Sequence, residues 1–240
     1  MTPTLRLFLA RHGETPGNRE MRYLGAADEP LSATGESQAD GLAAALGSLP
    51  IAAIYASPRR RTMETGRRIA AVLGLDLQME ERLREQCFGE WEGKTRPEVL
   101  ANDREALLAW EADLSLAPPG GDSLNVVQER VVAFVEEMRR DLPGAWVALV
   151  SHVGPIKALL CAALGVPLAA ARRLFLDPGT LTVVDWGERP VVRLFNAHGH
   201  LGWGEARWMR EGSPPAVTTA HGASGRDGAR TRSSSAFTER

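Results

Sequence analysis

An apolar run that ends in an Arg-His-Gly triplet constrains this chain more than any other feature of its sequence. Residues 5–10 are mostly apolar and contain no proline or glycine, which is typical of a buried strand. Arg11 and His12 follow at its carboxyl end, where open α/β sheets bind ligands. Arginine fits phosphate oxygens, imidazole is a nucleophile, and Gly13 lets a backbone N–H approach an anion. The triplet predicts an anion site, although alone it is equally compatible with a structural ion pair.

Two later segments repeat this arrangement of a strand followed by polar side chains. Residues 51–56 predict a strand with Ser57 and the run 59–61 after it, and residues 145–150 predict another with His152 after it. Helical patterns lie between and beyond them, over 33–47, from 60 to about 73, and over 96–115, 123–140 and 153–164. This alternation predicts an α/β fold in which the strand ends converge.

The remaining segments complete the expected organisation. Two strands at 180–186 and 190–196 predict a hairpin, and residues 211–240, rich in Gly, Ser, Pro, Thr and Arg, predict a disordered tail. We therefore expect one domain over 1–210 with a small helical cap inserted at about 95–120. In the helix at 123–140 the expected inner stripe is Val126, Val127, Val131, Phe134, Val135 and Met138.

Composition narrows the classes of function. The chain has 240 residues, 44% of them hydrophobic, and a net charge of -2, which argues against a general nucleic-acid binder. No leader peptide is expected, and no apolar run approaches the length of about 20 residues that a membrane-spanning helix needs. Two cysteines without a partner motif fit a reducing cytoplasm and no metal site.

A segment at 83–93 carries carboxylates among aromatic side chains. One of Glu85, Glu90 and Glu92, held beside apolar groups, could keep a raised pKa and act as a general acid. Phe88 and Trp91 fit packing better than binding. Together with the strand ends, the set offers a nucleophile, cationic clamps and an acid, which is what phosphoryl transfer through a phosphohistidine requires.

Four blocks of the chain resemble the histidine phosphatase superfamily, also called the phosphoglycerate mutase-like family. They are the 11–15 segment RHGET with Asn18, the 57–65 segment with Ser57, Arg61 and Thr65, the 83–93 segment with Glu85, and the 151–154 segment SHVG. The resemblance covers residues 4–205 and implies a three-layer α/β/α sandwich with a mostly parallel sheet. Residues 150–157 also resemble the phosphatase module that is fused to ribonuclease H in some bacteria.

The resemblance implies a role for each matching residue and no metal or other cofactor. The nucleophile would be His12, the acid and later base Glu85, and the phosphate clamps Arg11, Arg61 and His152. Leu24 and Val153 depart from the usual residues of the family at positions beside the substrate, whereas Glu14 and Glu92 fit structural roles. The residues expected to contact substrate are Gly13, Asn18, Arg22, Leu24, Gly25 and Val153.

The form of the 83–93 segment, here called the acid loop, and the short span before His152 favour the phosphatase branch. That branch includes α-ribazole phosphatases and broad phosphomonoesterases. We expect a metal-independent enzyme that hydrolyses a small phosphorylated metabolite, as a cytoplasmic monomer or homodimer without nucleic-acid or membrane partners. A cofactor-dependent phosphoglycerate mutase is the alternative. A non-catalytic binding protein on the same fold is disfavoured because His12 and Glu85 are both present.

Overall fold

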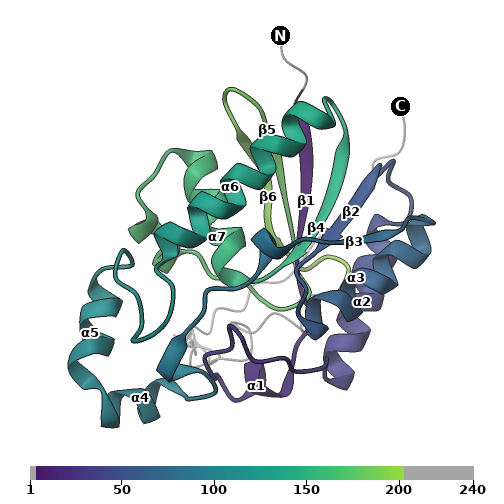
Figure 1. The fold of residues 1–240 in the computed structure, drawn as a ribbon. Helices are drawn as coiled ribbons and strands as arrows, with labels where there is room; N and C mark the ends of the chain where they lie inside the picture. Colours follow the sequence, from purple (N-terminus) through teal and green to yellow (C-terminus); the bar gives the residue numbers. More distant parts are fainter. Residues whose placement is uncertain (1–3, 203–240) are drawn as a thin grey trace, which may run out of the picture.

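A single six-stranded sheet organises the computed structural model, which describes residues 4–202 (Figure 1). The strands lie in the order β3-β2-β4-β1-β5-β6, and β5 runs in the opposite direction to the other five. The predicted α/β fold with a mostly parallel sheet is therefore confirmed. The strand bounds are β1 Leu5–Arg11, β2 Ala53–Ala56, β3 Leu77–Met79, β4 Trp146–Ser151, β5 Leu181–Trp186 and β6 Val191–Ala197.

Helices cover both faces of the sheet. On one face lie α2 (Ala33–Leu46) and α3 (Arg60–Leu73), and on the other α6 (Leu124–Asp141) and α7 (Val153–Leu164) (Figure 1). The two faces of β1 supply both cores, since alternate residues of a strand point to opposite sides. Leu7 packs in the core beneath α6 and α7, and Phe8 packs in the core beneath α2 and α3. The structure is thus a three-layer sandwich.

The predicted helix ends have clear physical causes. The hydroxyl of Ser32 accepts the Gly35 N–H at the start of α2, and that of Ser123 accepts the Val126 N–H at the start of α6. Helix α3 ends at Gly74, whose φ of 67° lies in the left-handed region that favours glycine. Val126, however, is 48% exposed, so the prediction that it belongs to the inner stripe is wrong.

The predicted helix at 96–115 is two helices, α4 (Arg96–Asn102) and α5 (Arg104–Ala112). Asp103 breaks the helix with φ -146° and ψ 51°, and its carboxylate accepts the indole N–H of Trp91 at 2.9 Å. The break lets α5 fold back so that Val99 and Leu107 pack on Trp91 in a separate small core. Satisfying a buried indole N–H is a tertiary requirement that helical periodicity does not reveal.

Short elements place these helices over the carboxyl ends of the strands. Helix α1 (Pro16–Arg19) follows β1 directly, and α1, α4 and α5 lie beyond the lower end of the sheet (Figure 1). Three 3-10 turns, Glu81–Leu83, Gly89–Trp91 and Leu168–Arg173, connect the larger elements.

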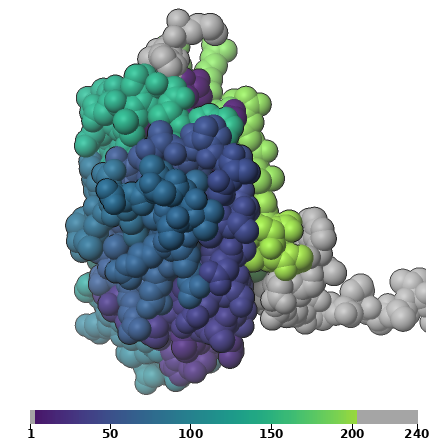
Figure 2. All heavy atoms as spheres, turned by 90° about the vertical axis from the view of Figure 1, so that its right-hand side faces the viewer, coloured from purple at the N-terminus to yellow at the C-terminus, as the bar shows by residue number. Residues whose placement is uncertain are grey.

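Strands β3 and β6 form the two edges of the sheet. Figure 2 shows the blue residues of α3 and β3 in front and the yellow-green strand β6 at the margin.

Between residues 4 and 202, no helix is long and apolar enough to cross a membrane. The predicted tail at 211–240 lies outside the described residues.

Candidate active site

The carboxyl ends of β1 and β4 bring two histidines together. Arg11 pairs with Ser151 in the parallel register, and the His12 N–H donates to the Ser151 carbonyl at 3.1 Å. The rings of His12 and His152 lie with centroids 5.1 Å apart, and both side chains are buried. Arg11, also buried, donates from Nη1 to the Leu176 carbonyl at 2.6 Å. The residues expected at the three strand ends thus converge in space.

The tautomer of His12 is fixed by its own loop. Its Nδ1 lies 2.7 Å from the Gly13 carbonyl, which can only accept, so Nδ1 carries the proton. Burial lowers the pKa of His12 well below its usual value, and the Arg61 and Arg11 guanidiniums lower it further. The imidazole is therefore neutral near pH 7, with the lone pair of Nε2 available as a nucleophile.

His152 has the opposite tautomer. Arg61 Nε donates to its Nδ1 at 3.3 Å, so its proton is on Nε2, which donates to the Ser57 hydroxyl at 2.8 Å. Burial and the nearby Arg61 lower the pKa of His152 well below the usual range. The sequence predicts that His152 binds phosphate. In the structure both of its ring nitrogens already have hydrogen-bond partners within the protein. An incoming phosphate must therefore compete with Ser57 for the Nε2 proton.

Arg61 of the arginine run contacts His152 and is completely buried, and Arg59 lines a neighbouring pocket together with Glu85. Its Nη1 donates to the Ala27 carbonyl at 2.6 Å, and its Nη2 donates to the carbonyls of Leu24 and Gly25 at 3.1 and 3.2 Å. With the bond to His152, these contacts leave one of five N–H groups available. Arg60 instead pairs with Glu64 at the surface. Helical spacing separates the neighbours, as the sequence predicts.

Glu85 sits opposite this cluster, anchored by the first turn of α7. Its carboxylate accepts the Gly154 N–H at 3.0 Å and the Gln86 N–H at 2.9 Å. Burial raises the pKa of Glu85, against the opposing effects of the Gln86 N–H, Arg61, Arg11 and the Gly154 N–H. A raised pKa suits a general acid. A Cβ at position 154 would lie under 3.0 Å from Glu85 Oε1, so glycine lets the carboxylate take this position without displacement.

Gly13 has a different structural role from the one expected. Its N–H donates to the Thr65 hydroxyl at 3.1 Å, so the amide is engaged inside the protein rather than open to an anion. A Cβ at position 13 would overlap the carbonyl of Gly35 in the first turn of α2. The glycine is needed because β1 and α2 approach closely here.

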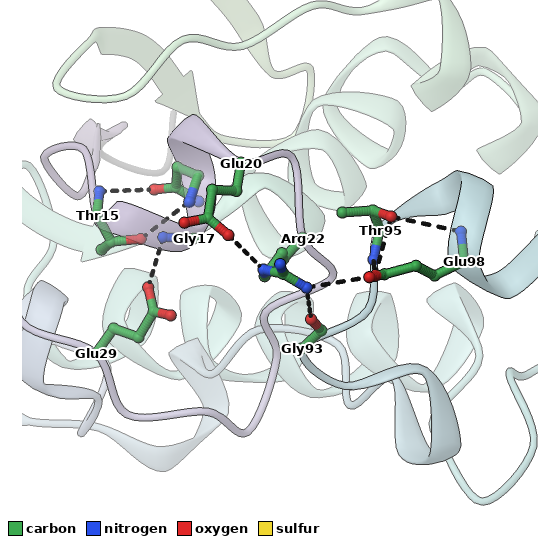
Figure 3. A network of polar contacts seen from close by, with 9 residues as sticks. Thr15, Gly17, Glu20, Arg22, Glu29, Gly93, Thr95 and Glu98 are labelled. Atoms are coloured by element: carbon green, nitrogen blue, oxygen red, sulfur yellow. Dashed lines mark hydrogen bonds and ion pairs between the residues drawn. The ribbon is translucent and has the colours of Figure 1, made fainter.

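Asn18 and Arg22 organise the segment after β1. Asn18 forms a reciprocal cap with Thr15, through bonds of 3.1 and 3.2 Å. Arg22 lies between Glu20 and Glu98 and donates to the Gly93 carbonyl at 2.7 Å (Figure 3). Arg22 therefore ties the 20–25 segment to the start of the cap, and these partners engage its guanidinium.

Leu24 and Gly25 belong to a loop held from two sides. Their carbonyls accept from Arg61, whereas the Gly25 and Ala26 N–H groups donate to the Glu92 carboxylate at 3.0 and 2.8 Å. A Cβ on Gly25 would overlap the Gln86 carbonyl, so the loop packs directly on the acid loop. Glu92 has the structural role expected of it.

Val153 lines a pocket of about 200 Å³ that Glu85 also lines, here called the leaving-group pocket. Its walls are mostly apolar, and α5, α7 and the acid loop all contribute. Its lining comprises Tyr23, Glu85, Gln86, Phe88, Trp110, Leu114, Leu124, Val153, Gly154, Lys157, Ala171 and Arg172.

Sequence reasoning assigned no role to several residues that shape the site. Ser57 and Gly154 stand in the matching blocks, but only the fold shows that Ser57 orients His152 and that Gly154 accommodates Glu85. Arg130 of α6 donates to the carbonyls of Arg84 and Glu85 at 2.6 and 3.0 Å, fixing the acid loop. No local motif marks Arg130, because its partners lie about 45 residues away. In residues 4–202 no group of three or more His, Cys, Asp or Glu could hold a metal ion.

Known proteins with similar sequences and structures include several phosphatases. A bifunctional protein of Mycobacterium tuberculosis is 37% identical over 203 residues, which cover 83% of this chain and 56% of that protein. Phosphoserine phosphatase 1 of Hydrogenobacter thermophilus is 36% identical over 200 residues, covering 82% and 95%. A probable phosphoglycerate mutase of Enterobacter sp. is 35% identical over 208 residues, with the same coverage.

Solved structures agree with these sequence relationships. Mycobacterial glucosyl-3-phosphoglycerate phosphatase superimposes with a TM-score of 0.75 at 32% identity, over 80% of this chain and 99% of that one. This chain spans about half the length of the mycobacterial bifunctional protein. A model of the histidine phosphatase superfamily, branch 1, matches residues 7–198. The chain therefore belongs to the histidine phosphatase superfamily.

Proposed function

We propose that this chain is a phosphomonoesterase that hydrolyses small phosphate esters through a phosphohistidine on His12. The observation that carries the proposal is the fixed tautomer of His12, whose Nδ1 is bonded to the Gly13 carbonyl while Nε2 keeps its lone pair. Arg11 and Arg61 supply positive charge around this nitrogen, and Glu85 has an environment that favours its protonated form. A nucleophile, clamps and an acid are thus assembled in one buried cluster.

In the first step, Nε2 of His12 attacks phosphorus as the ester P–O bond breaks. Glu85 gives its proton to the departing alkoxide, so the products are a free alcohol and phosphohistidine. Arg11 and the available N–H of Arg61 offset the negative charge on the phosphoryl oxygens. Glu85 is left as a carboxylate, held by the Gly154 and Gln86 N–H groups.

In the second step, water attacks the phosphohistidine. The Glu85 carboxylate takes a proton from this water, the P–N bond breaks, and inorganic phosphate leaves with its negative charge beside the guanidiniums. Neutral His12 and protonated Glu85 are restored, which closes the cycle. The protein supplies mainly positioning and charge, since phosphoryl transfer demands little else.

A mutase is disfavoured by the shape of the cap. A mutase must shelter its phosphohistidine from water, whereas the span before β4 holds only the short helices α4 and α5 and the core helix α6. A purely binding function is disfavoured because His12 and Glu85 are both present and both placed for chemistry. The preference for hydrolysis is supported by relatives named phosphoserine phosphatase and glucosyl-3-phosphoglycerate phosphatase.

The substrate, on this proposal, is a small phosphorylated metabolite, and catalysis needs no metal. We propose a cytoplasmic monomer or homodimer that binds neither nucleic acid nor membranes. The free thiols of Cys87 and Cys161 and the net charge of -2 support these assignments.

The test is a panel of phosphate esters assayed for inorganic phosphate with and without a bisphosphoglycerate primer. We expect release of phosphate without the primer, and loss of release in His12→Asn. Rapid interconversion of phosphoglycerates with little phosphate release would establish the mutase instead. No turnover of any ester by folded protein would support the binding function.

A further inference from the structure

The leaving-group pocket begins at the catalytic acid and runs beneath the cap. Glu85 lines it, so this space can receive the alcohol that Glu85 protonates. One wall is aromatic: Tyr23 lies 5.1 Å from Phe88 and 6.0 Å from Trp110, measured between ring centroids. These rings give the leaving group flat apolar surface to pack against.

A single half-buried cation lies on the floor of this pocket. Lys157 stands three residues after Gly154 on α7, so the two residues lie on the same helix face, and both line the pocket. Within residues 4–202 its ammonium forms no hydrogen bond or ion pair. Burial lowers the pKa of Lys157, the positive charge of Arg11 lowers it further, and Glu85 opposes the shift. The ammonium is not among the fully buried polar atoms, so it is open to pair with an anion that arrives with the ligand.

The other charged groups of the pocket leave this charge unmatched. Glu85 is the one carboxylate among the lining residues, and its N–H partners are already in place. Arg172 lies at the rim, exposed, with its guanidinium 5.6 Å from the Trp110 ring. When Glu85 is protonated for catalysis, the pocket therefore carries net positive charge.

We propose that Lys157 is a specificity residue that pairs with a carboxylate on the leaving group of the substrate. The preferred substrate is thus a phosphate monoester whose alcohol carries one carboxylate and an apolar or ring-bearing portion. A carboxylate is favoured over a second phosphate because one ammonium matches one negative charge, and the pocket of about 200 Å³ is small. This inference rests on the proposed phosphatase activity.

The test compares three benzyl phosphates that differ at the para position: 4-carboxybenzyl, unsubstituted and 4-(aminomethyl)benzyl phosphate. The protein should prefer the carboxylate ester over the unsubstituted ester about tenfold to hundredfold in kcat/KM, as expected for a charged hydrogen bond. Lys157→Met should bring that ratio close to one. Lys157→Glu should invert the order in favour of the aminomethyl ester.

Lys94→Met is the matched control, because it makes the same substitution at an exposed lysine that does not line this pocket. Its ratio should stay close to that of the unmodified protein. Equal turnover of all three esters by the unmodified protein, or a carboxylate preference that survives Lys157→Met, would overturn the assignment of Lys157. Failure to hydrolyse any of the three esters would instead count against the phosphatase activity itself.

Discussion

Replacing Gly154 by alanine should separate catalysis from stability. Gly154 is the second residue of α7, and its N–H holds the carboxylate of Glu85 at 3.0 Å. An added Cβ would lie under 3.0 Å from Glu85 Oε1, whereas ordinary contact begins at 3.4 Å. The obstructed atom is the end of a flexible side chain, so Glu85 moves and the helix stays.

The size of the effect follows from that displacement. Glu85 must shift by roughly 1 Å and lose its bond to the Gly154 N–H, and a misplacement of this order costs about 10²-fold in rate. The full contribution of a general acid is about 10²–10⁴-fold, which sets the upper limit. Alanine favours a helix by up to about 1 kcal/mol over glycine, so stability should not fall with activity.

The assay is kcat on benzyl phosphate, whose alcohol needs protonation, together with thermal unfolding. Gly199→Ala is the matched control, because no atom lies within 4 Å of a Cβ built there. We expect Gly154→Ala to lose about 10²-fold in kcat at an unchanged melting temperature, and Gly199→Ala to keep both. Full activity in Gly154→Ala would refute the placement of the acid. A parallel loss of activity and melting temperature would assign Gly154 to packing alone.

Three further predictions concern proton and metal chemistry. Glu85→Gln should slow the hydrolysis of alkyl esters by about 10²–10⁴-fold. It should leave the phosphorylation of the protein by p-nitrophenyl phosphate rapid, since nitrophenolate leaves unprotonated. Equal losses of rate with both esters in rapid-quench assays would remove Glu85 from the mechanism. Folding lowers the pKa of His152, so below the unfolded value of 6.5 the unfolded state binds a proton that the folded state does not. The free energy of unfolding therefore decreases as the pH falls below 6.5. Between pH 7.5 and 5.5 the unfolding free energy of His152→Gln should therefore fall less than that of the unmodified protein, by at most about 1.4 kcal/mol. Equal slopes in denaturant titrations would contradict this. Chelator treatment should leave turnover intact, and a loss reversed only by a divalent ion would show a metal requirement.

Most of the fold could be predicted because its signals are local. Apolar runs ending in polar residues marked β1 and β4, and capping by Ser32 and Ser123 marked the starts of α2 and α6. The break at Asp103 could not be predicted, since it depends on the indole N–H of Trp91 across the cap core. Tertiary partners override helical periodicity where a buried polar group needs satisfying.

The identities of the site residues could be predicted more fully than their hydrogen bonds. That His12 and His152 lie close together could be predicted, because each follows a strand and parallel strands of one sheet end at the same edge. The bond from Gly13 to Thr65 depends on contacts between distant segments, as does the hold of Arg130 on the acid loop. Such contacts have no periodicity or spacing that a single sequence reveals. The spacing of Lys157 from Gly154 was visible, but its pocket was not.

The central claim is that His12 carries the phosphoryl group during turnover. The most direct measurement is rapid-quench trapping with a radiolabelled p-nitrophenyl phosphate, followed by peptide mapping of the labelled protein. We expect an acid-labile, alkali-stable label on the peptide that contains His12, formed faster than the steady-state turnover and absent from His12→Asn. A label on His152 or on a carboxylate, or full turnover by His12→Asn without a trapped intermediate, would contradict the account.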